Sequence, residues 1–192
     1  MKFQSLALAA AFALGAVLPA AAEPHVLDKS HASITFQVDH LGFSTVHGKF
    51  REFDAQIEFD PEKVEDTRLR FVVMADSIDT GWGPRDDHLK TGDFFAAAEN
   101  PEIVFESTSV TPTGSDTADV AGTLTMKGAS HPVTFMAKLN KLGPSPFDPS
   151  KTIAGFTATG EIDRTKFGMD YAAPAVSAVI PVRIDLEMSP AN

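Results

Sequence analysis

The sequence contains no cysteine, and its 192 residues include one tryptophan and one tyrosine. The absence of cysteine excludes disulfides, thiolate metal ligands and a bacterial lipid anchor attached to cysteine. It does not identify the redox compartment, because a chain of this length can bury an adequate core without disulfides. The aromatic content consists mainly of 15 phenylalanines. An aromatic interior built from these side chains carries few polar groups, which suits an apolar ligand better than catalytic chemistry.

The recognised catalytic and nucleotide-binding motifs are also absent. There is no phosphate-binding P-loop and no dinucleotide fingerprint. The segment 42–46 starts like a nucleophile elbow, Gly42-Phe43-Ser44, but ends in Val46 where the motif needs a second glycine. The sequence therefore presents no catalytic constellation, and we expect a protein that is not an enzyme.

The first 22 residues have the pattern of a secretory signal peptide. Lys2 supplies the charged start, residues 6–18 are apolar, and three alanines at 20–22 supply the cleavage site before Glu23. An apolar run of about 13 residues is too short to span a bilayer, which needs ~20. We therefore expect export to the periplasm and cleavage, which leaves residues 23–192 as one domain.

The charge of the chain excludes two classes of partner. The net charge is −10 at pH 7, and Lys2 is the one charged residue of the predicted signal peptide, so residues 23–192 carry one more negative charge. An acidic protein is repelled by nucleic acid and by anionic membrane surfaces. We expect neither as a partner, and attribute the charge to solubility.

Apolar and polar residues alternate along most of the chain. In residues 32–40 the side chains of Ile34, Phe36, Val38 and His40 share one face, which is the pattern of a strand with one buried side. Similar apolar rows occur in residues 46–59 (with a bulge at 51–52), 69–75, 103–105, 120–126, 133–139, 156–162 and 176–188. Eight such strands in series predict an all-β, eight-stranded antiparallel barrel, which is wide enough to hold one small ligand.

Two segments interrupt the alternation. Residues 83–100 contain Pro84 at a first helical position, Gly92 at a helix end and Asn100-Pro101 as a stop, which predicts a short helical crossover over one end of the barrel. Residues 142–150 hold three prolines and a glycine and are predicted to form a loop.

The inward rows predict the residues that face a ligand. Shared parity with apolar neighbours places these side chains in the barrel interior, and the predicted ligand-binding residues are Phe36, Val38, Phe50, Phe71, Val73, Phe105, Leu124, Phe135, Phe156, Ala158 and Ile180. Small residues on the same rows either widen a cavity or only make room for phenylalanine rings, and the sequence leaves both interpretations open; they are Gly48, Ala75, Gly122, Ala137, Ala158, Gly160 and Ala178.

Polar residues near the predicted crossover mark a mouth of the barrel. Arg85, Asp86, Asp87 and His88 form the densest polar cluster. Together with His40, Arg85 and His88 are candidates to contact a ligand headgroup. The alternative, which we favour, is a cluster of ion pairs and helix caps that joins the crossover to the barrel. Further candidates at turns, on weaker grounds, are Lys127, His131, Arg164 and Lys166.

Three histidines, His31, His40 and His47, invite a comparison with metal sites. Metal ligands must converge on one point, but His31 precedes the first predicted strand, and His47 has the opposite parity to the apolar Val46. We therefore expect no metal site and interpret these histidines as hydrogen-bonding groups at the barrel ends.

Five segments together resemble the YceI-like family of polyisoprenoid-binding proteins. They are HASITFQVDHLGFSTVHGKF at 31–50, SIDTGWGPRDDHLKTGDFF at 77–95, ENPEIVFES at 99–107, GTLTMKGASHPVTF at 122–135 and GFTATGEIDRTKFGM at 155–169. The resemblance implies a lipocalin-like barrel, secreted or periplasmic, that holds an isoprenoid lipid such as a quinone or a polyprenyl phosphate and uses no other cofactor. Residues 174–188 depart from it, because they lack the acidic turn often found before the last strand.

Two further interpretations were weighed against a lipid carrier. An enzyme that acts on a lipid or lipid headgroup, with a histidine as acid or base, remains the alternative. An outer-membrane barrel has the same alternation, but it needs two rings of interfacial aromatic residues, and one tryptophan with one tyrosine cannot supply them. We expect no stable membrane insertion, and a homodimer is compatible with the sequence.

Overall fold

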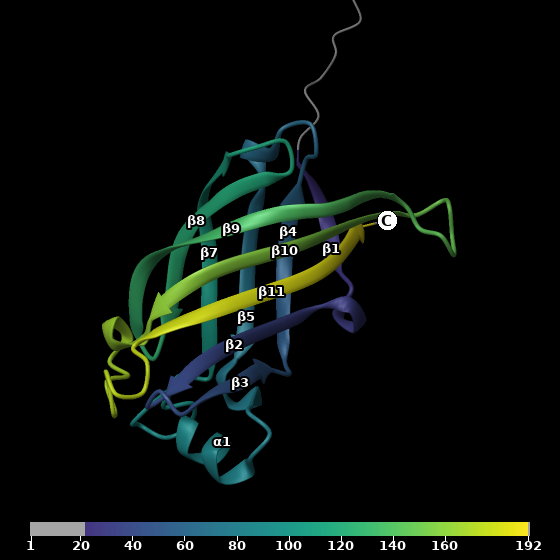
Figure 1. Ribbon diagram of the computed structural model, residues 1–192. Helices are drawn as coiled ribbons and strands as arrows, with labels where there is room; N and C mark the ends of the chain where they lie inside the picture. The colour runs from purple at the N-terminus through teal and green to yellow at the C-terminus, as the bar shows by residue number, and fades with distance from the viewer. Residues whose placement is uncertain (1–21, 192) are drawn as a thin grey trace, which may run out of the picture.

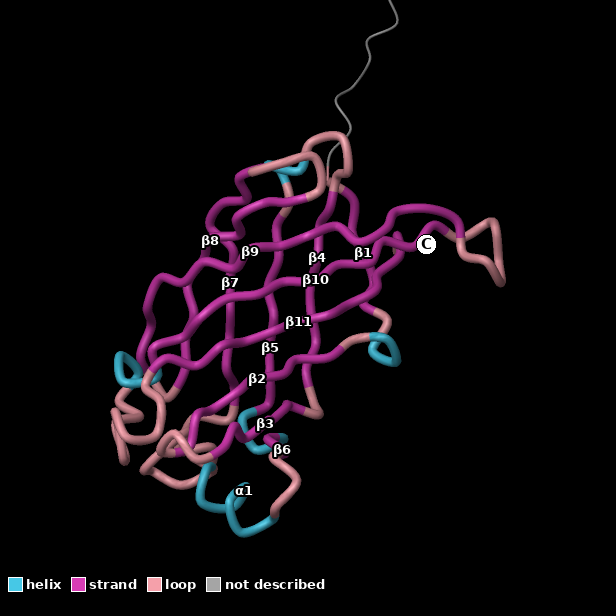
Figure 2. The backbone as a smooth tube through the Cα atoms, viewed as in Figure 1, coloured by secondary structure: helices cyan, strands magenta, loops and turns pink. Residues whose placement is uncertain are grey.

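The computed structural model describes residues 22–191, so all but the last residue of the predicted signal peptide lies outside the described part. Strands dominate, and the helical turns lie between them near the ends of the molecule (Figure 2). The strands are β1 Glu23–Leu27, β2 Ser33–His40, β3 Ser44–Phe50, β4 Phe53–Phe59, β5 Arg68–Met74, β6 Ile78–Asp79, β7 Glu102–Pro112, β8 Thr117–Met126, β9 Ala129–Pro144, β10 Thr152–Asp163 and β11 Val179–Pro190. The helices are α1 Gly83–Leu89 and the 3₁₀ turns η1 Lys29–His31, η2 Val64–Asp66, η3 Ala75–Ser77 and η4 Arg164–Phe167.

The strands form one closed antiparallel sheet, which confirms the predicted eight-stranded barrel (Figure 1). Three of the eight barrel strands are divided in two by a turn or a break: β1 with β2, β3 with β4, and β5 with β6. The last strand, β11, closes the barrel by pairing with both halves of the first, at Leu27↔Met188 and Ile34↔Ile184. Closure removes the unpaired edges that an open sheet would expose.

Residues 51–52, predicted as a bulge within one strand, are instead a corner between two separate strands, β3 and β4. β3 pairs with β2, whereas β4 pairs with β1 and β5. The corner is held from outside, because the guanidinium of Arg51 donates to Asp79 Oδ2 at 2.7 and 2.9 Å. The slip in the alternation therefore marks the point where the chain bends to follow the barrel wall.

The structure corrects three expectations about boundaries. The short strand β1 was missed, because its five residues include Pro24 and show little alternation. β9 extends to Pro144, which shortens the predicted loop at 142–150 to residues 145–151. In the crossover, the α-helix covers only Gly83–Leu89, and residues 90–100 are turns and short connections.

The short helix α1 lies at one end of the barrel, beside the end of β3 (Figure 1). The β9–β10 hairpin projects from the molecule near the C-terminus, away from α1 (Figure 1). Within residues 22–191, no helix has the length and the apolar character needed to cross a membrane. The inward rows of the strands form a single cluster of buried apolar side chains.

Candidate functional site

An apolar cavity of about 540 Å³ runs through the barrel. Its wall includes Arg85, His88 and Tyr171 at the α1 end. It also includes Val64 of η2 and Thr117 at the start of β8, toward the other end. A ligand in this cavity would be surrounded by side chains from most of the barrel strands. The interior is therefore a cavity rather than a completely filled core.

The cavity wall contains every residue that the sequence predicted to face a ligand. The predicted ligand-binding residues on the wall are Phe36, Val38, Phe50, Phe71, Val73, Phe105, Leu124, Phe135, Phe156, Ala158 and Ile180. Their common parity along the strands brings them together, because alternate side chains of a strand face the same side of a sheet. That each of them contacts a bound ligand stays a prediction.

Phenylalanine rings in the wall pack edge to face. Phe105 and Phe135 have ring centroids 5.5 Å apart with planes at 89°, and Phe59 and Phe156 have centroids 5.4 Å apart with planes at 87°. This geometry sets the positive edge of one ring against the negative face of the next. These contacts fix the rings against the barrel wall and leave the space along its axis to a ligand.

Five of the seven small residues predicted on inward rows divide into two groups. The other two, Ala75 in η3 and Ala178 before β11, lie outside the strands and do not line the cavity. A Cβ at Gly48 would overlap the Phe36 ring, a Cβ at Gly122 would overlap the Phe105 ring, and a Cβ at Gly160 would lie 2.6 Å from Cδ1 of Phe135. These three glycines make room for phenylalanine rings and do not line the cavity.

Two alanines behave differently from these glycines. Ala137 and Ala158 lie opposite each other on β9 and β10 and line the cavity. The two interpretations left open by the sequence are therefore both correct, at different positions. The ring over each glycine belongs to a neighbouring strand, so no pattern within the glycine's own strand distinguishes the two groups.

Arg85 lies at the α1 end of the cavity, but the predicted ion pairs with Asp86 and Asp87 are wrong. Arg85 Nε donates to Thr80 Oγ1 at 2.6 Å, and Nη2 donates to Thr80 O at 2.8 Å. Asp86 Oδ1 accepts from the backbone N–H of Thr80 at 2.8 Å. Thr80 thus joins both residues to the end of β6, because side chains adjacent on a helix point in different directions. Arg85 also lies over the Trp82 ring, with Cζ 5.8 Å from its centroid.

The two mouth histidines have different surroundings. His88 Nε2 lies 2.9 Å from Asp93 Oδ2, and the His88 ring packs edge to face against Phe94 and Tyr171 at 5.2 and 5.1 Å. His40 ends β2 and forms an isolated bridge with Val176. Both histidines line the cavity, as Arg85 does. The three predicted mouth residues therefore lie together at the α1 end of the cavity.

Arg164 has a larger structural role than the sequence indicated. Its side chain is 6% exposed, and it donates to four backbone carbonyls, those of Met169, Tyr171, Val176 and Ser177. Burial lowers the pKa of this guanidinium, and the negative charges of Asp170 and then Asp163 partly offset that effect. Arg164 therefore holds the loop between η4 and β11 in place at the α1 end of the cavity.

Two of the other three turn candidates, Lys127 and His131, also make contacts that stabilise the fold. Lys127 Nζ donates to Gly92 O and to Gly168 O, both at 2.7 Å, and so joins the crossover to the loop after η4. The His131 ring packs against Phe167 with centroids 5.0 Å apart. Lys166 is exposed.

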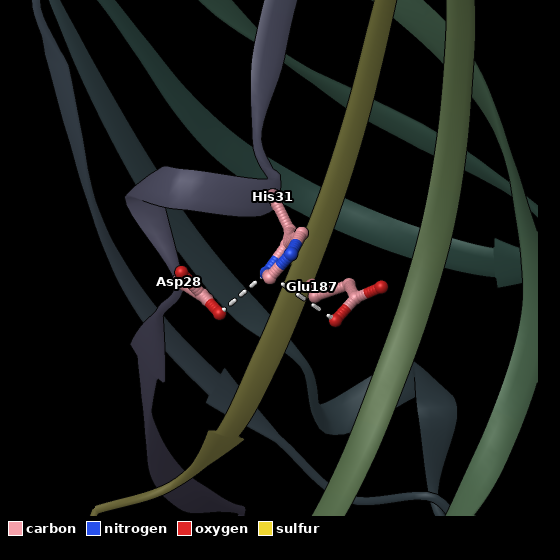
Figure 3. A group of neighbouring side chains, drawn as sticks. All are labelled: Asp28, His31 and Glu187. Atoms are coloured by element: carbon pink, nitrogen blue, oxygen red, sulfur yellow. Dashed lines mark hydrogen bonds and ion pairs between the residues drawn. The ribbon is translucent and has the colours of Figure 1, made fainter. Parts of the chain in front are cut away.

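His31, His40 and His47 do not form one group. Figure 3 shows His31 between Asp28 and Glu187, on the outside of the barrel. Among residues 22–191, this is the one set of three potential metal ligands whose atoms converge, all within 4.8 Å. His40 lines the cavity, and His47 is exposed on β3.

Hydrogen bonds account for the arrangement around His31. Asp28 Oδ1 accepts from Ser30 N and Oγ, and Asp28 Oδ2 lies 2.9 Å from His31 Nδ1. The bonds from Ser30 and then His31 lower the pKa of Asp28 to about 2. The bond to Asp28 raises the pKa of His31. The group stabilises η1, the turn that connects β1 to β2 beside β11.

Comparison with known sequences identifies full-length relatives. A UPF0312 protein of Pseudomonas aeruginosa is 35% identical over 184 residues, which cover 93% of this chain and 95% of the relative. A UPF0312 protein of Azotobacter vinelandii is 34% identical over 184 residues, with coverage of 93% and 95%.

Solved structures have the same fold. BcnA of Burkholderia cenocepacia superposes with a TM-score of 0.76 at 22% identity, over 84% of this chain and 98% of BcnA. The YCEI protein of Campylobacter jejuni gives 0.73 at 28% identity, over 80% and 90%. A polyisoprenoid binding domain from Saccharophagus degradans gives 0.65 at 14% identity, over 88% and 99%. The model of the YceI-like domain matches residues 25–188. The chain belongs to the YceI-like family.

Proposed function

We propose that this protein is a periplasmic carrier of an isoprenoid lipid, an isoprenoid quinone or a polyprenyl phosphate, held in the barrel interior. The observation that carries the proposal is the continuous apolar cavity of about 540 Å³. A long hydrocarbon tail binds there because each CH₂ removed from water contributes ~0.8 kcal/mol, less the cost of ordering the tail. The polyisoprenoid binding described for the Saccharophagus degradans domain supports the choice of lipid.

The headgroup of the lipid belongs at the α1 end of the cavity. The sequence predicted three polar groups that contact a headgroup, and all three line the cavity; they are Arg85, His40 and His88. Arg85 uses Nε–H and one N–H of Nη2 to donate to Thr80. The guanidinium has five N–H donors, so its remaining N–H groups can donate to a quinone or phosphate oxygen. Most of the binding free energy comes from the tail, because the cavity wall is mainly apolar.

Extraction and native mass spectrometry of the purified protein test this function. A carrier retains an intact isoprenoid lipid at a fixed ratio to protein, and its N-terminus begins at Glu23 in the periplasmic fraction. An enzyme that acts on a lipid headgroup would instead convert added lipid and release a product. Protein that retains no lipid and takes up neither a quinone nor a polyprenyl phosphate would contradict the proposal.

Substitution of Arg85 separates a headgroup contact from a structural role. We expect Arg85→Ala to lower stability by about 0.5–1.5 kcal/mol, because it loses the hydrogen bonds to Thr80, and to change lipid affinity less. Arg70→Ala is the matched control, because Arg70 pairs with Glu106 in an exposed position. Unchanged melting with a tenfold or greater loss of affinity would make Arg85 the headgroup ligand.

A further inference from the structure

Four exposed apolar or aromatic side chains lie at the α1 end of the molecule. Leu41 is 48% exposed, Phe43 87%, Trp82 59% and Tyr171 49%. They include the one tryptophan and the one tyrosine of the chain. We call these four residues the apolar rim. Tryptophan and tyrosine are the side chains that prefer the interface between a membrane and water, where one part of the ring is in apolar surroundings and the other is hydrated.

Contacts between three separate segments bring the rim together. The backbone N–H of Leu41 donates to Ala175 O at 3.2 Å, so the β2–β3 turn adjoins the loop before β11. The Tyr171 ring packs against His88 of α1 with centroids 5.1 Å apart. Figure 1 shows the β2–β3 turn, α1 and this loop at the same end of the barrel. The rim is therefore one surface rather than scattered exposed residues.

The rim borders the cavity. Tyr171 itself lines the cavity, and so do Arg85, which lies against the Trp82 ring, and His40, which precedes Leu41. The rim therefore adjoins the α1 end of the cavity.

The turn between β2 and β3 carries two of the rim residues. Leu41 has φ of 60° and Gly42 has φ of 74°, and the backbone N–H of Phe43 donates to His40 O at 3.0 Å, which closes the turn. Leu41 and Phe43 lie between the two strands and are both exposed. The turn therefore presents two apolar side chains to solvent at this end of the barrel.

The charge around the rim suits a neutral membrane surface. Residues 39–44, 79–94 and 164–178 together hold four basic and six acidic residues, and the whole chain has a net charge of −10. This end of the molecule is therefore weakly acidic, like the rest of the chain. It can approach zwitterionic headgroups without repulsion, while the acidic remainder of the protein disfavours an anionic surface.

We propose that the apolar rim docks the α1 end of the barrel onto a zwitterionic phospholipid bilayer. In that position a lipid tail passes between the bilayer and the cavity without crossing water. This inference rests on the proposed function for its purpose, but docking itself is measurable without reference to the ligand.

Trp82 is a built-in probe for this docking, because no other tryptophan contributes to the fluorescence. We expect its emission to shift to the blue on addition of phosphatidylcholine vesicles and to be quenched by brominated phosphatidylcholine. The protein should also float with the vesicles in a density gradient. The exported form is used, with its N-terminus verified by mass spectrometry, because an uncleaved segment 1–22 would itself bind vesicles.

Two matched variants locate the contact. Phe43→Ser should reduce the vesicle partition coefficient at least fivefold. Phe147→Ser should leave it within twofold, because Phe147 is 97% exposed in the loop of the β9–β10 hairpin, which projects away from α1 (Figure 1). Circular dichroism and melting curves establish that both variants are folded.

Three results would overturn the proposal. The first is wild-type protein that neither floats with the vesicles nor shows a Trp82 shift. The second is an equal loss of partition in both variants, which would assign binding to general surface apolarity. The third is a dimer that Phe43→Ser converts to monomer without vesicles, which would make the rim an interface between copies. Lipid retained in the purified protein, measured in parallel, tests the carrier function separately from docking.

Discussion

Filling the cavity from one position on its wall tests whether it holds the lipid. Ala158 lies on β10, opposite Ala137 of β9 and Ile184 of β11, and both alanines line the cavity. Two adjacent alanines leave a shallow region of wall, so the ring in Ala158→Phe has free volume to enter. This distinguishes Ala158 from Gly122, where a Cβ already meets the Phe105 ring and the backbone oxygen of Glu106.

The size of the expected effect depends on how many carbon atoms of the tail the new ring displaces. If the new ring displaces two carbon atoms of a lipid tail, the loss is ~1.6 kcal/mol at ~0.8 kcal/mol per CH₂, about 15-fold in affinity. The cost in folding stability should stay below ~1.5 kcal/mol, whereas a ring forced into a packed core typically costs 1–3 kcal/mol, about as much as the binding loss itself. We therefore expect Ala158→Phe to lose bound lipid while it remains folded.

The measurements are lipid per folded molecule, by native mass spectrometry, and the thermal unfolding midpoint. Thr159→Phe is the matched control, because it adds the same ring one residue along β10, with the opposite parity and so on the outer face. Unchanged lipid content in Ala158→Phe would place the ligand elsewhere. A collapse of stability with unchanged lipid per folded molecule would show that the interior near Ala158 is packed.

Three further outcomes are expected. Gly122→Ala should destabilise the fold by about 1–3 kcal/mol in chemical denaturation, because its Cβ overlaps the Phe105 ring; an unchanged midpoint would contradict that packing. Arg164→Met should cost about 1–3 kcal/mol, because it leaves part-buried carbonyls without donors, and protease cleavage within residues 167–178 should increase; equal cleavage would refute its role in holding the loop.

The third outcome concerns pH. Because folding lowers the pKa of Asp28, this carboxylate stabilises the fold above about pH 4, and the stabilisation is lost as the pH falls toward 2. Because folding raises the pKa of His31, the protonated ring stabilises the fold below about pH 6.5, and this stabilisation is lost at higher pH. The melting difference between wild type and His31→Gln should therefore be largest at about pH 4–6 and shrink as the pH rises further. A difference that is constant with pH would contradict it.

The inward-facing strand residues of the cavity wall were predictable from the sequence alone, whereas wall residues in turns, such as Val64 and Tyr171, were not. Alternation places Phe36, Phe105 and Phe135 on inward faces because side-chain direction along a strand depends only on local backbone geometry. Tight turns are also local features, as at Lys127-Gly128, whose φ values of 49° and 74° form the turn between β8 and β9. The one-residue slip at 51–52 likewise located the bend between β3 and β4.

Contacts between distant segments were decided only by the tertiary structure. Whether Gly122 or Ala158 borders open space depends on the ring of a neighbouring strand, which no pattern within β8 or β10 records. Arg85 donates a hydrogen bond to Thr80 and forms no ion pair with its neighbour Asp86, because its side chain on α1 points toward the end of β6. The apolar rim exists for the same reason. Its members are far apart in the sequence, and barrel closure brings the turns that carry them to one end of the cavity, so their meeting is a property of the fold and not of any segment.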